Sequence, residues 1–294
     1  MNKKYLFIWV TFVLLAWFAV ETVISPTLHV IACDVGQGDA YLLRYKMYEV
    51  LIDGGSSEKV LECLSRNMPF FDRTLEVIVA THPDKDHIGG LIHVMNTYKI
   101  DQIITNGQNS ETQTYKTLAE TYSKQKIPVF HPKKDEVFLG GPLTWTTIWT
   151  YEKNEEKYDV QDKNSSKRSA KKESTNANSL TLRLEFGGFS ALFTGDLEIP
   201  QEKELISSGK LLPVTVLKIG HHGSNNSTSE DFLEKLRPHI ALLGVGKRNG
   251  YGHPSRRVLQ LLEKYHIQTF RTDIDGEIEL ETDGKTVWKT WRVI

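Results

Sequence analysis

Residues 81–90 read THPDKDHIGG and directly follow the stretch LEVIVA at 75–80. The earlier stretch is nearly all apolar, which predicts a strand covered on both faces of a sheet. Four potential metal ligands lie within six positions after it: His82, Asp84, Asp86 and His87. Loops at such strand ends carry the active sites of α/β folds. Imidazole and carboxyl groups this close compete for protons, and a divalent cation resolves that competition. A solvated surface turn is the alternative, which the apolar strand and the two following glycines disfavour.

Short strands and helices are predicted on both sides of this stretch. Strands are expected at 29–33, 40–45, 48–52, 103–106, 129–131, 180–186, 189–194, 214–219, 240–245, 269–272, 277–280 and 285–292, with a β-rich region at 137–151. Helices are expected at 59–66, 88–98, 111–125, 229–236 and 255–265. The pattern divides into two halves, each of strands followed by a helix.

Composition and charge are those of an ordinary globular protein. The chain has 294 residues, of which 39% are hydrophobic and 25% charged, so it is long enough to bury a sizeable core. The formal net charge is -1, which removes a global basic field as an argument for a polyanionic partner without excluding nucleic acid. Cys33 and Cys63 lie in apolar surroundings and are predicted to be core residues, with one disulfide between them as the alternative.

The N-terminus has the pattern of an export segment. Residues 1–4 are basic, and residues 5–20 follow with no charged side chain. The apolar run is slightly short for a transmembrane helix of about 20 residues, and Ala19 lacks the small neighbours of a cleavage site. We predict that residues 1–26 are a signal peptide or an uncleaved membrane anchor. Residues 27–294 would then be extracellular or on the outer face of the cytoplasmic membrane. A buried N-terminal helix is the alternative.

One segment of the 27–294 domain has little to bury. Residues 152–176 include thirteen charged side chains among twenty-five, mixed with serine and asparagine. Such a composition predicts a mobile charged surface loop.

The motif His-x-Asp-x-Asp-His at 82–87 resembles that of the metallo-β-lactamase superfamily, which normally reads His-x-His-x-Asp-His. With aspartate in place of histidine at position 84, the motif resembles that of the extracellular domain of ComEC-type competence proteins. Those proteins act in bacterial DNA uptake. Seven further segments match that subgroup in order: DVGQGDA at 34–40, DGG at 53–55, NSL at 178–180, FTGD at 193–196, LK and HHGS within 217–224, YGHP at 251–254 and RTD at 271–273. The resemblance runs from about residue 28 to 294 and is specific because the order is kept.

The resemblance implies both a fold and an activity. It implies an α+β metallo-β-lactamase fold, a four-layer αβ/βα sandwich, preceded by the N-terminal export or anchor segment. The activity would be that of an exported metal-dependent hydrolase that cleaves phosphodiester bonds of DNA in connection with DNA uptake. A small-molecule hydrolase of the same fold, acting on a lactone, ester or nucleotide, is one alternative. A non-catalytic DNA-uptake module with a decayed metal site is the other.

The resemblance also assigns metal ligands. The predicted set is His82, Asp84, Asp86, His87, Asp196, and one of His221 and His222, with His221 favoured. Asp196 matches the bridging carboxylate of the family, and Asp53 is either a support of the site or a turn residue. The first metal site of the family uses three histidines. Here Asp84 replaces one of them, and the position of another lies near Asn178. Because this set has more oxygen donors and fewer imidazoles than that of the family, Mn²⁺ or Mg²⁺ competes with Zn²⁺ for it. The site would hold one ion or two.

Three residues are predicted to act on the substrate. Asp86 would orient the attacking water and help to accept its proton. Lys218 and His253 would stabilise developing negative charge. Completing the metal shell is the alternative role for His253. A basic groove for DNA is expected from Lys218, Lys247, Arg248, Arg256 and Arg257. The histidines at 29, 93, 131, 239 and 266 lack nearby partners in the sequence and are predicted to be structural.

Overall fold

The computed structural model describes residues 3–23, 26–152 and 174–290 of the chain. Its strands form an eight-stranded and a seven-stranded sheet. The eight-stranded sheet contains, in chain order, β1 (Leu28–Ala32), β2 (Tyr41–Tyr45), β3 (Tyr48–Ile52), β4 (Thr74–Ala80), β5 (Lys99–Thr105), β6 (Val129–Phe130), β14 (Ile278–Thr282) and β15 (Val287–Thr290). The seven-stranded sheet contains β7 (Val137–Gly140), β8 (Leu143–Trp149), β9 (Thr181–Phe186), β10 (Phe189–Phe193), β11 (Val216–Lys218), β12 (Ile240–Leu243) and β13 (Gln268–Arg271).

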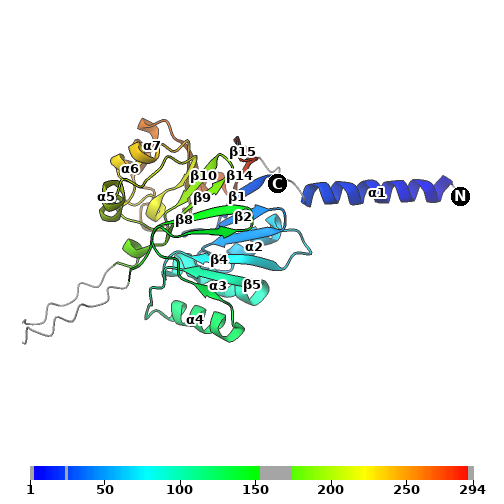
Figure 1. Ribbon diagram of the computed structural model, residues 1–294, viewed down its shortest axis with the longest axis horizontal. Coiled ribbons are helices and arrows are strands. Elements are labelled where there is room, and N and C mark those ends of the chain that lie inside the picture. The colour runs from blue at the N-terminus through cyan, green and yellow to red at the C-terminus, as the bar shows by residue number, and fades with distance from the viewer. Residues whose placement is uncertain (1–2, 24–25, 153–173, 291–294) are drawn as a thin grey trace, which may run out of the picture.

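Helices cover the outer face of each sheet (Figure 1). The eight-stranded sheet carries α2 (Lys59–Asn67), α3 (Lys85–Thr97) and α4 (Gln113–Gln125). The seven-stranded sheet carries α5 (Ile199–Ser207), α6 (Glu230–Leu236) and α7 (Arg256–Lys264). Short helical turns follow at η1 (Asn176–Asn178), η2 (Gly220–Gly223) and α8 (Thr272–Asp275). The predicted α+β sandwich of two sheets between helical layers is confirmed.

Three apolar clusters hold these layers together. Leu28, Val30 and Ala32 of β1 enter the core between the sheets, whereas Ile31 points toward the helices. A third cluster lies between the seven-stranded sheet and its helices. Because successive side chains of a strand alternate between faces, a strand buried on both faces is apolar throughout. This is why the central strands were recognisable as continuous apolar runs.

The parallel strands of both sheets end at one edge of the sandwich, and the candidate site residues lie there. In the eight-stranded sheet β3, β4, β5 and β6 are parallel, and in the other β10, β11, β12 and β13 are parallel. The loops after β1, β3, β4, β10, β11 and β12 meet at the carboxyl ends of these strands. Residues far apart in the sequence therefore come together there.

Helix α3 begins three residues before the predicted start, at Lys85, with Asp84 as its N-cap. Asp86 and His87 therefore lie in the first helical turn. The helix packs closely on the turn after β3, because a Cβ at Gly90 would lie 1.9 Å from the carbonyl oxygen of Gly54. Any side chain at position 90 would separate α3 from that turn. Helix α5 was not predicted from the sequence.

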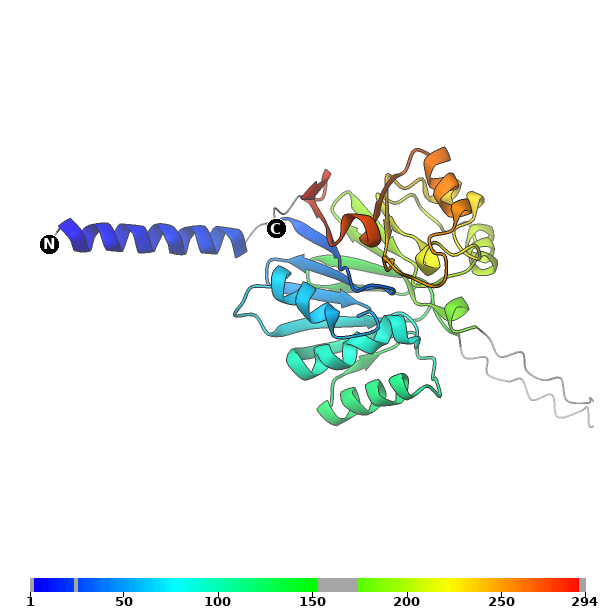
Figure 2. The same ribbon diagram turned by 180° about the vertical axis from the view of Figure 1, so that it is seen from behind.

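The N-terminal helix α1 (Lys3–Val23) runs away from the two-sheet body (Figures 1 and 2). Its side chains Tyr5, Phe7 and Trp9 are exposed. Within the residues that the structure describes, none of the helices combines the length and apolarity required to cross a bilayer. The assignment of residues 1–26 as a signal peptide or anchor stays a prediction.

The predicted mobile loop at 152–176 falls mostly on residues 153–173, outside the described part of the chain. Its last residues are described and lead into η1. The side chain of Asn176 reaches His221, with its amide nitrogen 3.3 Å from each ring nitrogen. The end of this segment therefore belongs to the surroundings of the candidate site.

Cys33 and Cys63 form a disulfide that joins the end of β1 to α2. Both residues are buried, as the sequence predicted, but they are bonded to each other rather than packed as free thiols. The alternative that the sequence left open is therefore the correct one. The bond fixes α2 beside the loop that follows β1.

A buried acid on β3 gives the fold a pH-dependent stability. Glu49 is fully buried, and its backbone N–H donates to Oε2 of Glu76 at 2.7 Å. Burial, with Asp72 and Glu76 nearby, raises the pKa of Glu49 from 4.5 to about 8. Because the folded pKa is the higher one, ionisation opposes folding, and stability is lost as the pH rises from about 4.5 through 8.

We expect Glu49→Gln to raise the free energy of unfolding at pH 9 by roughly 2–4 kcal/mol, since one pKa unit corresponds to about 1.4 kcal/mol. At pH 4 the variant and the wild type should differ little, because Glu49 is then protonated. Urea unfolding at both pH values measures this, with Glu120→Gln on the exposed face of α4 as a control. An equal shift at the two pH values would contradict the assignment.

Candidate metal centre

Asp196 is the centre of a cluster of imidazoles at the carboxyl edge of the sheets. It follows β10, is 3% exposed, and its backbone N–H donates to Oγ of Ser179 at 2.9 Å. Its Oδ1 lies 3.3 Å from Nε2 of His87. Its Oδ2 lies 3.6 Å, 3.8 Å and 3.9 Å from the Nε2 atoms of His222, His221 and His82 respectively. One carboxylate thus faces four imidazole nitrogens from two segments, the one after β4 and the one after β11.

Three of these imidazoles are fixed through Nδ1. The Nδ1 of His87 donates to Oδ2 of Asp53 at 2.8 Å, and that of His222 donates to the carbonyl of Gly244 at 2.9 Å. The Nδ1 of His82 lies 3.1 Å from the hydroxyl of Thr81. The Nε2 atoms of all three rings are buried and have no hydrogen-bond partner among the described residues. Such atoms are costly to bury unless something binds them.

The spacing of these donors fits a divalent metal. The separations of 3.3–3.9 Å around Asp196 are longer than hydrogen bonds. Two ligand atoms about 2.1 Å from a tetrahedral ion lie about 3.4 Å apart, close to the observed separations. Metal-binding histidines are typically held by a hydrogen bond from the other ring nitrogen, as they are here. The donor set therefore fits a divalent ion bound through Nε2 and carboxylate oxygens.

Asp84 and Asp86 complete the cluster on its open side. The side chain of Asp86 is 35% exposed, and its Oδ2 lies 3.4 Å from Nε2 of His222. The side chain of Asp84 is 39% exposed, with Oδ2 at 3.8 Å from Nε2 of His82. The structure therefore brings together all four ligands predicted from residues 82–87, with Asp196. The two aspartates face solvent, and the histidines lie beneath them.

The two adjacent histidines after β11 occupy different depths. Both have a left-handed backbone, with φ of 45° at His221 and 52° at His222, which turns both rings toward Asp196. His222 is buried and held by Gly244, whereas the side chain of His221 is 23% exposed beside Asn176. The sequence favours His221 as the ligand, whereas the geometry supports His222. His221 lies at the rim.

Asp39 was not predicted as a site residue, yet it is 1% exposed within the same cluster. Among the described residues, a group of potential ligands is formed by Asp39, His87, Asp196 and His222. Asp39 approaches the Nδ1 side of both rings, at 3.8 Å from His87 and 3.4 Å from His222. The Nε2 atoms point the other way, toward Asp196. Asp39 therefore supports the histidines from behind instead of sharing a metal with them.

The ammonium group of Lys218 is enclosed behind the cluster. It forms an ion pair with Asp39, donates to the carbonyl of Gly195, and lies 3.4 Å from Oδ1 of Asp196. The residue is only 2% exposed. The predicted role of Lys218 in contacting substrate stays a prediction, and in the structure its ammonium group faces the buried carboxylates of Asp39 and Asp196. Asp39 and Lys218 form a buried ion pair that lies behind the cluster and supports it.

Asp53 supports the site, one of the two roles the sequence allowed. It is buried with φ of 57° and accepts from Thr81 through the backbone N–H at 2.9 Å and the hydroxyl at 2.7 Å. It also accepts from His87. One carboxylate thus orients His87 directly and His82 through Thr81.

Charges in the cluster follow from burial and from these pairs. Burial alone would raise the pKa of Asp196, but His222, His87 and Lys218 outweigh it and hold that pKa well below its usual range. Burial lowers the pKa of His82 to about 3, so this ring is neutral, as a metal ligand must be. Burial opposes a charge on His222, but Asp196 and Asp39 raise its pKa to about 10. The carboxylates thus stabilise positive charge within the cluster, and a bound metal ion would supply that charge.

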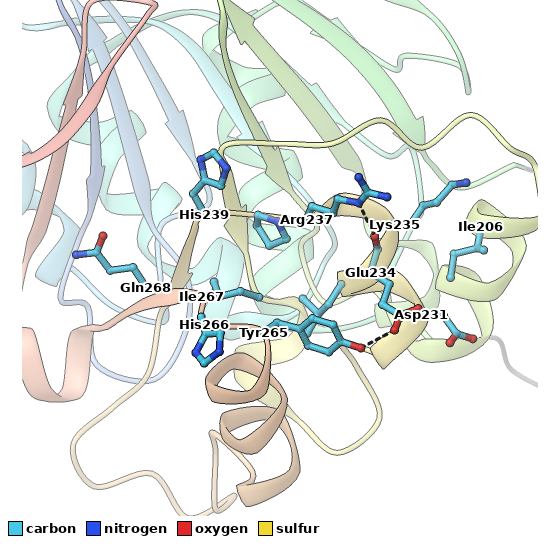
Figure 3. A pocket seen from close by; sticks show the side chains of 12 residues that line it. Ile206, Asp231, Glu234, Lys235, Arg237, His239, Tyr265, His266, Ile267 and Gln268 are labelled. Carbon is cyan, nitrogen blue, oxygen red and sulfur yellow. Dashed lines mark hydrogen bonds between the residues drawn. The ribbon is translucent and has the colours of Figure 1, made fainter.

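The remaining histidines lie elsewhere. His29 has a partner that the sequence did not indicate, since its Nδ1 lies 2.8 Å from Oε1 of Glu279. His239 and His266 line a cavity of about 1020 Å³ between α6 and the end of α7 (Figure 3). There Tyr265 donates to Glu234 at 2.6 Å. This cavity lies at the amino ends of β12 and β13, opposite the carboxyl edge that bears the candidate metal ligands.

Comparison with known proteins agrees with this geometry. The family model described as the metallo-beta-lactamase superfamily matches residues 33–247. ComE operon protein 3 of Bacillus subtilis is 31% identical over 271 residues, which cover 84% of this chain and 32% of that protein. Competence protein ComA of Neisseria gonorrhoeae is 27% identical over 84% of this chain and 31% of its own length. The chain spans about a third of the length of these curated relatives.

Solved structures share the fold at low sequence identity. A metallo hydrolase from the archaeon Ignicoccus hospitalis superposes with a TM-score of 0.55 at 14% identity, covering 86% of this chain and 99% of that one. The diiron β-hydroxylase CmlA from Streptomyces venezuelae superposes with a TM-score of 0.53 at 12% identity, covering 87% and 54%. The second example shows that this fold hosts more than one reaction. From the family match and the site, the chain belongs to the metallo-β-lactamase superfamily of metal-dependent hydrolases.

Proposed function

We propose that this chain hydrolyses phosphodiester bonds of DNA outside the cytoplasmic membrane, in connection with DNA uptake. The observation that carries the proposal is the cluster of buried Nε2 atoms and carboxylates around Asp196, in a chain similar to competence proteins. The cluster supports metal-dependent hydrolysis. The similarity supports DNA as the substrate.

The residues suited to hold the metal are His82, Asp84, Asp86, His87, Asp196 and His222, with His221 at the rim. Three nitrogens and three carboxylates form a mixed donor set that accepts Zn²⁺ or Mn²⁺, and Mg²⁺ less readily. A divalent ion in this position supplies Lewis-acid activation of water and of the phosphoryl group. The arrangement has room for one ion or two, since Asp196 faces histidines on both of its oxygens.

The chain's own residues orient the reactants. Asp86 is a carboxylate at the open side, because His222 and His87 outweigh burial and lower its pKa. It is placed to orient a water molecule through a hydrogen bond. Burial and the nearby His221 and His222 lower the pKa of His253, so its ring is neutral and offers an N–H to a phosphate oxygen. Both roles are the ones that the sequence predicts for Asp86 and His253.

Exposed basic residues near this edge support a polyanionic substrate, but fewer than predicted. Lys247, Arg248 and Arg256 are exposed. Arg257 is not free, because its guanidinium donates to the backbone carbonyls of Thr228, Asn225 and Ser227. With Lys218 also enclosed, three of the five predicted side chains remain available to DNA.

Two features support a location outside the membrane. The Cys33–Cys63 disulfide is typical of oxidising compartments. The basic and apolar start of the chain has the pattern of an export segment, whether cleaved or kept as an anchor. Together they support secretion or attachment to the outer face of the cytoplasmic membrane.

The test is hydrolysis of labelled single- and double-stranded DNA by the purified full chain with Mn²⁺, Zn²⁺ or Mg²⁺. We expect cleavage with at least one metal, loss of cleavage in Asp86→Ala, and a higher KM in Arg248→Glu. Metal content is measured in parallel. Hydrolysis of a lactone or phosphomonoester without any cleavage of DNA would overturn the DNA assignment and favour a small-molecule hydrolase. A wild type that binds little metal would instead favour a non-catalytic module.

A further inference from the structure

The loop that follows β12 carries an exposed aromatic ring beside the metal centre. Tyr251 is 74% exposed, and its ring stacks on that of His253 with 5.8 Å between centroids and 16° between planes. The ring of His253 meets that of His221 edge-on at 5.6 Å. The Nε2 of His221 in turn lies 3.8 Å from Oδ2 of Asp196. A continuous series of rings therefore leads from the metal cluster to the protein surface.

The loop is held in place by one asparagine. The side-chain amide of Asn249 donates to the carbonyls of Gly246 at 3.0 Å and His253 at 2.8 Å, and its oxygen accepts from the N–H of His253 at 3.0 Å. The root of the loop packs on the turn after β1, since a Cβ at Gly246 would lie 2.7 Å from the backbone nitrogen of Gln37. The ring of Tyr251 is thus exposed on a fixed segment.

The chemistry of the loop matches that of single-strand nucleic-acid binding. Tyr251 contributes one face to His253 and leaves the rest of its ring to solvent, so it adds little to the core. Lys247 and Arg248, on the same loop, are exposed. An aromatic ring for a base, next to cations for the backbone phosphates, is how proteins bind unpaired nucleic acid without reading its sequence.

We propose that Tyr251 stacks an unpaired nucleobase of the substrate beside the phosphodiester that the metal centre cleaves. The enzyme would then act on single-stranded DNA or on frayed ends in preference to a closed duplex. This inference rests on the proposed DNA hydrolase activity. Tyr251 is a positioning residue, because it contacts a base and not the reacting phosphate.

Steady-state hydrolysis of a labelled single-stranded oligonucleotide by the full chain with Mn²⁺ tests the inference. In Tyr251→Ala we expect KM to rise roughly tenfold with kcat within about twofold, in line with the loss of one base-stacking contact. Tyr251→Phe should behave as the wild type, because stacking needs the ring and not the hydroxyl. Phe70→Ala, at an 87% exposed ring on the loop between α2 and β4, is the matched control and should change neither constant.

An abasic substrate separates stacking from other effects. An oligonucleotide lacking the base beside the cleaved bond should raise the KM of the wild type to that of Tyr251→Ala, and should leave the variant unaffected. A Tyr251→Ala protein with wild-type KM on the intact strand would overturn the inference while the hydrolase proposal stands. So would a variant that still distinguishes the abasic strand.

A binding measurement decides the case in which no DNA is cleaved. Non-cleavable phosphorothioate oligonucleotides carry 2-aminopurine at each position in turn, and stacking on Tyr251 quenches its fluorescence. Quenching by the wild type, retained in Tyr251→Phe and lost in Tyr251→Ala, supports the base site even if the hydrolase proposal fails. Absence of quenching at every position with the wild type would overturn it.

Discussion

Asp196→Asn is expected to remove most of the divalent metal bound per chain and to lower the rate of hydrolysis by roughly 10³-fold or more. Asp196 faces the Nε2 atoms of four histidines at 3.3–3.9 Å. The asparagine keeps the volume of the side chain but loses its charge and one of its two oxygen donors. Several kcal/mol of transition-state stabilisation depend on the metal, and each 1.4 kcal/mol is worth about tenfold in rate.

The measurements are metal content by mass spectrometry, initial rates on the best substrate, and the unfolding midpoint. The midpoint in the presence of EDTA shows whether the variant is folded without metal. Asp101→Asn is the matched control, because Asp101 is an exposed aspartate of β5 paired with Lys99 at the surface. If Asp196→Asn kept its metal and its rate, the cluster around this carboxylate would not be the catalytic centre.

Local sequence patterns predicted the parts of the fold that local physics determines. Strands buried on both faces are largely apolar, and the bounds predicted for β1, β3 and β4 lie within one residue of the observed ones. The start of α3 was missed, because residues 85–87 combine charge with metal-ligand chemistry and lack helical periodicity. Helix α5 was missed because a proline in its first turn and a short amphipathic stretch resemble a loop.

The site was predictable where candidate ligands are neighbours in the sequence. It was not predictable where the backbone conformation determines which side chain faces the cluster. His82, Asp84, Asp86 and His87 were predicted from their spacing, and the structure brings them together. The choice between His221 and His222 depends on consecutive left-handed residues after β11, which no side-chain pattern encodes. That conformation sends His222 inward to the carbonyl of Gly244 and leaves His221 at the rim.

The pairing of Asp39 with Lys218 was not predicted, for another reason. Each looks ordinary in its own segment: an aspartate after a glycine turn, and a lysine at the end of an apolar strand. Their role depends on the ion pair between them, which forms only when both sheets are assembled. An apolar strand ending in lysine is a signal that could have been used, since a lysine flanked by buried residues needs a buried partner.

Lys218→Met is expected to lower the free energy of unfolding by about 3–5 kcal/mol, the usual cost of leaving a buried charge without its partner. Asp39 is 1% exposed and pairs with Lys218. In the variant the negative charge of Asp39 keeps His222 and His87 as neighbours of opposite charge. Methionine preserves the aliphatic stem of the lysine, so the loss reports the charge. Urea unfolding in EDTA measures it without a contribution from bound metal, and Lys285→Met at the exposed turn between β14 and β15 is the control.

The double variant Asp39→Asn/Lys218→Met distinguishes an ion pair from two independent roles. If the two residues serve mainly each other, removing both charges should cost much less than the sum of the single variants, and the double variant should recover most of the stability lost in Lys218→Met. If Lys218 instead acted on substrate, Lys218→Met would reduce kcat with little change in unfolding, and Asp39→Asn would restore nothing. The buried position of the ammonium, against Asp39 and the carbonyl of Gly195, favours the first outcome. The charge on Lys218 therefore offsets the carboxylates behind the histidines, and the Nε2 atoms and Asp196 remain available for the metal.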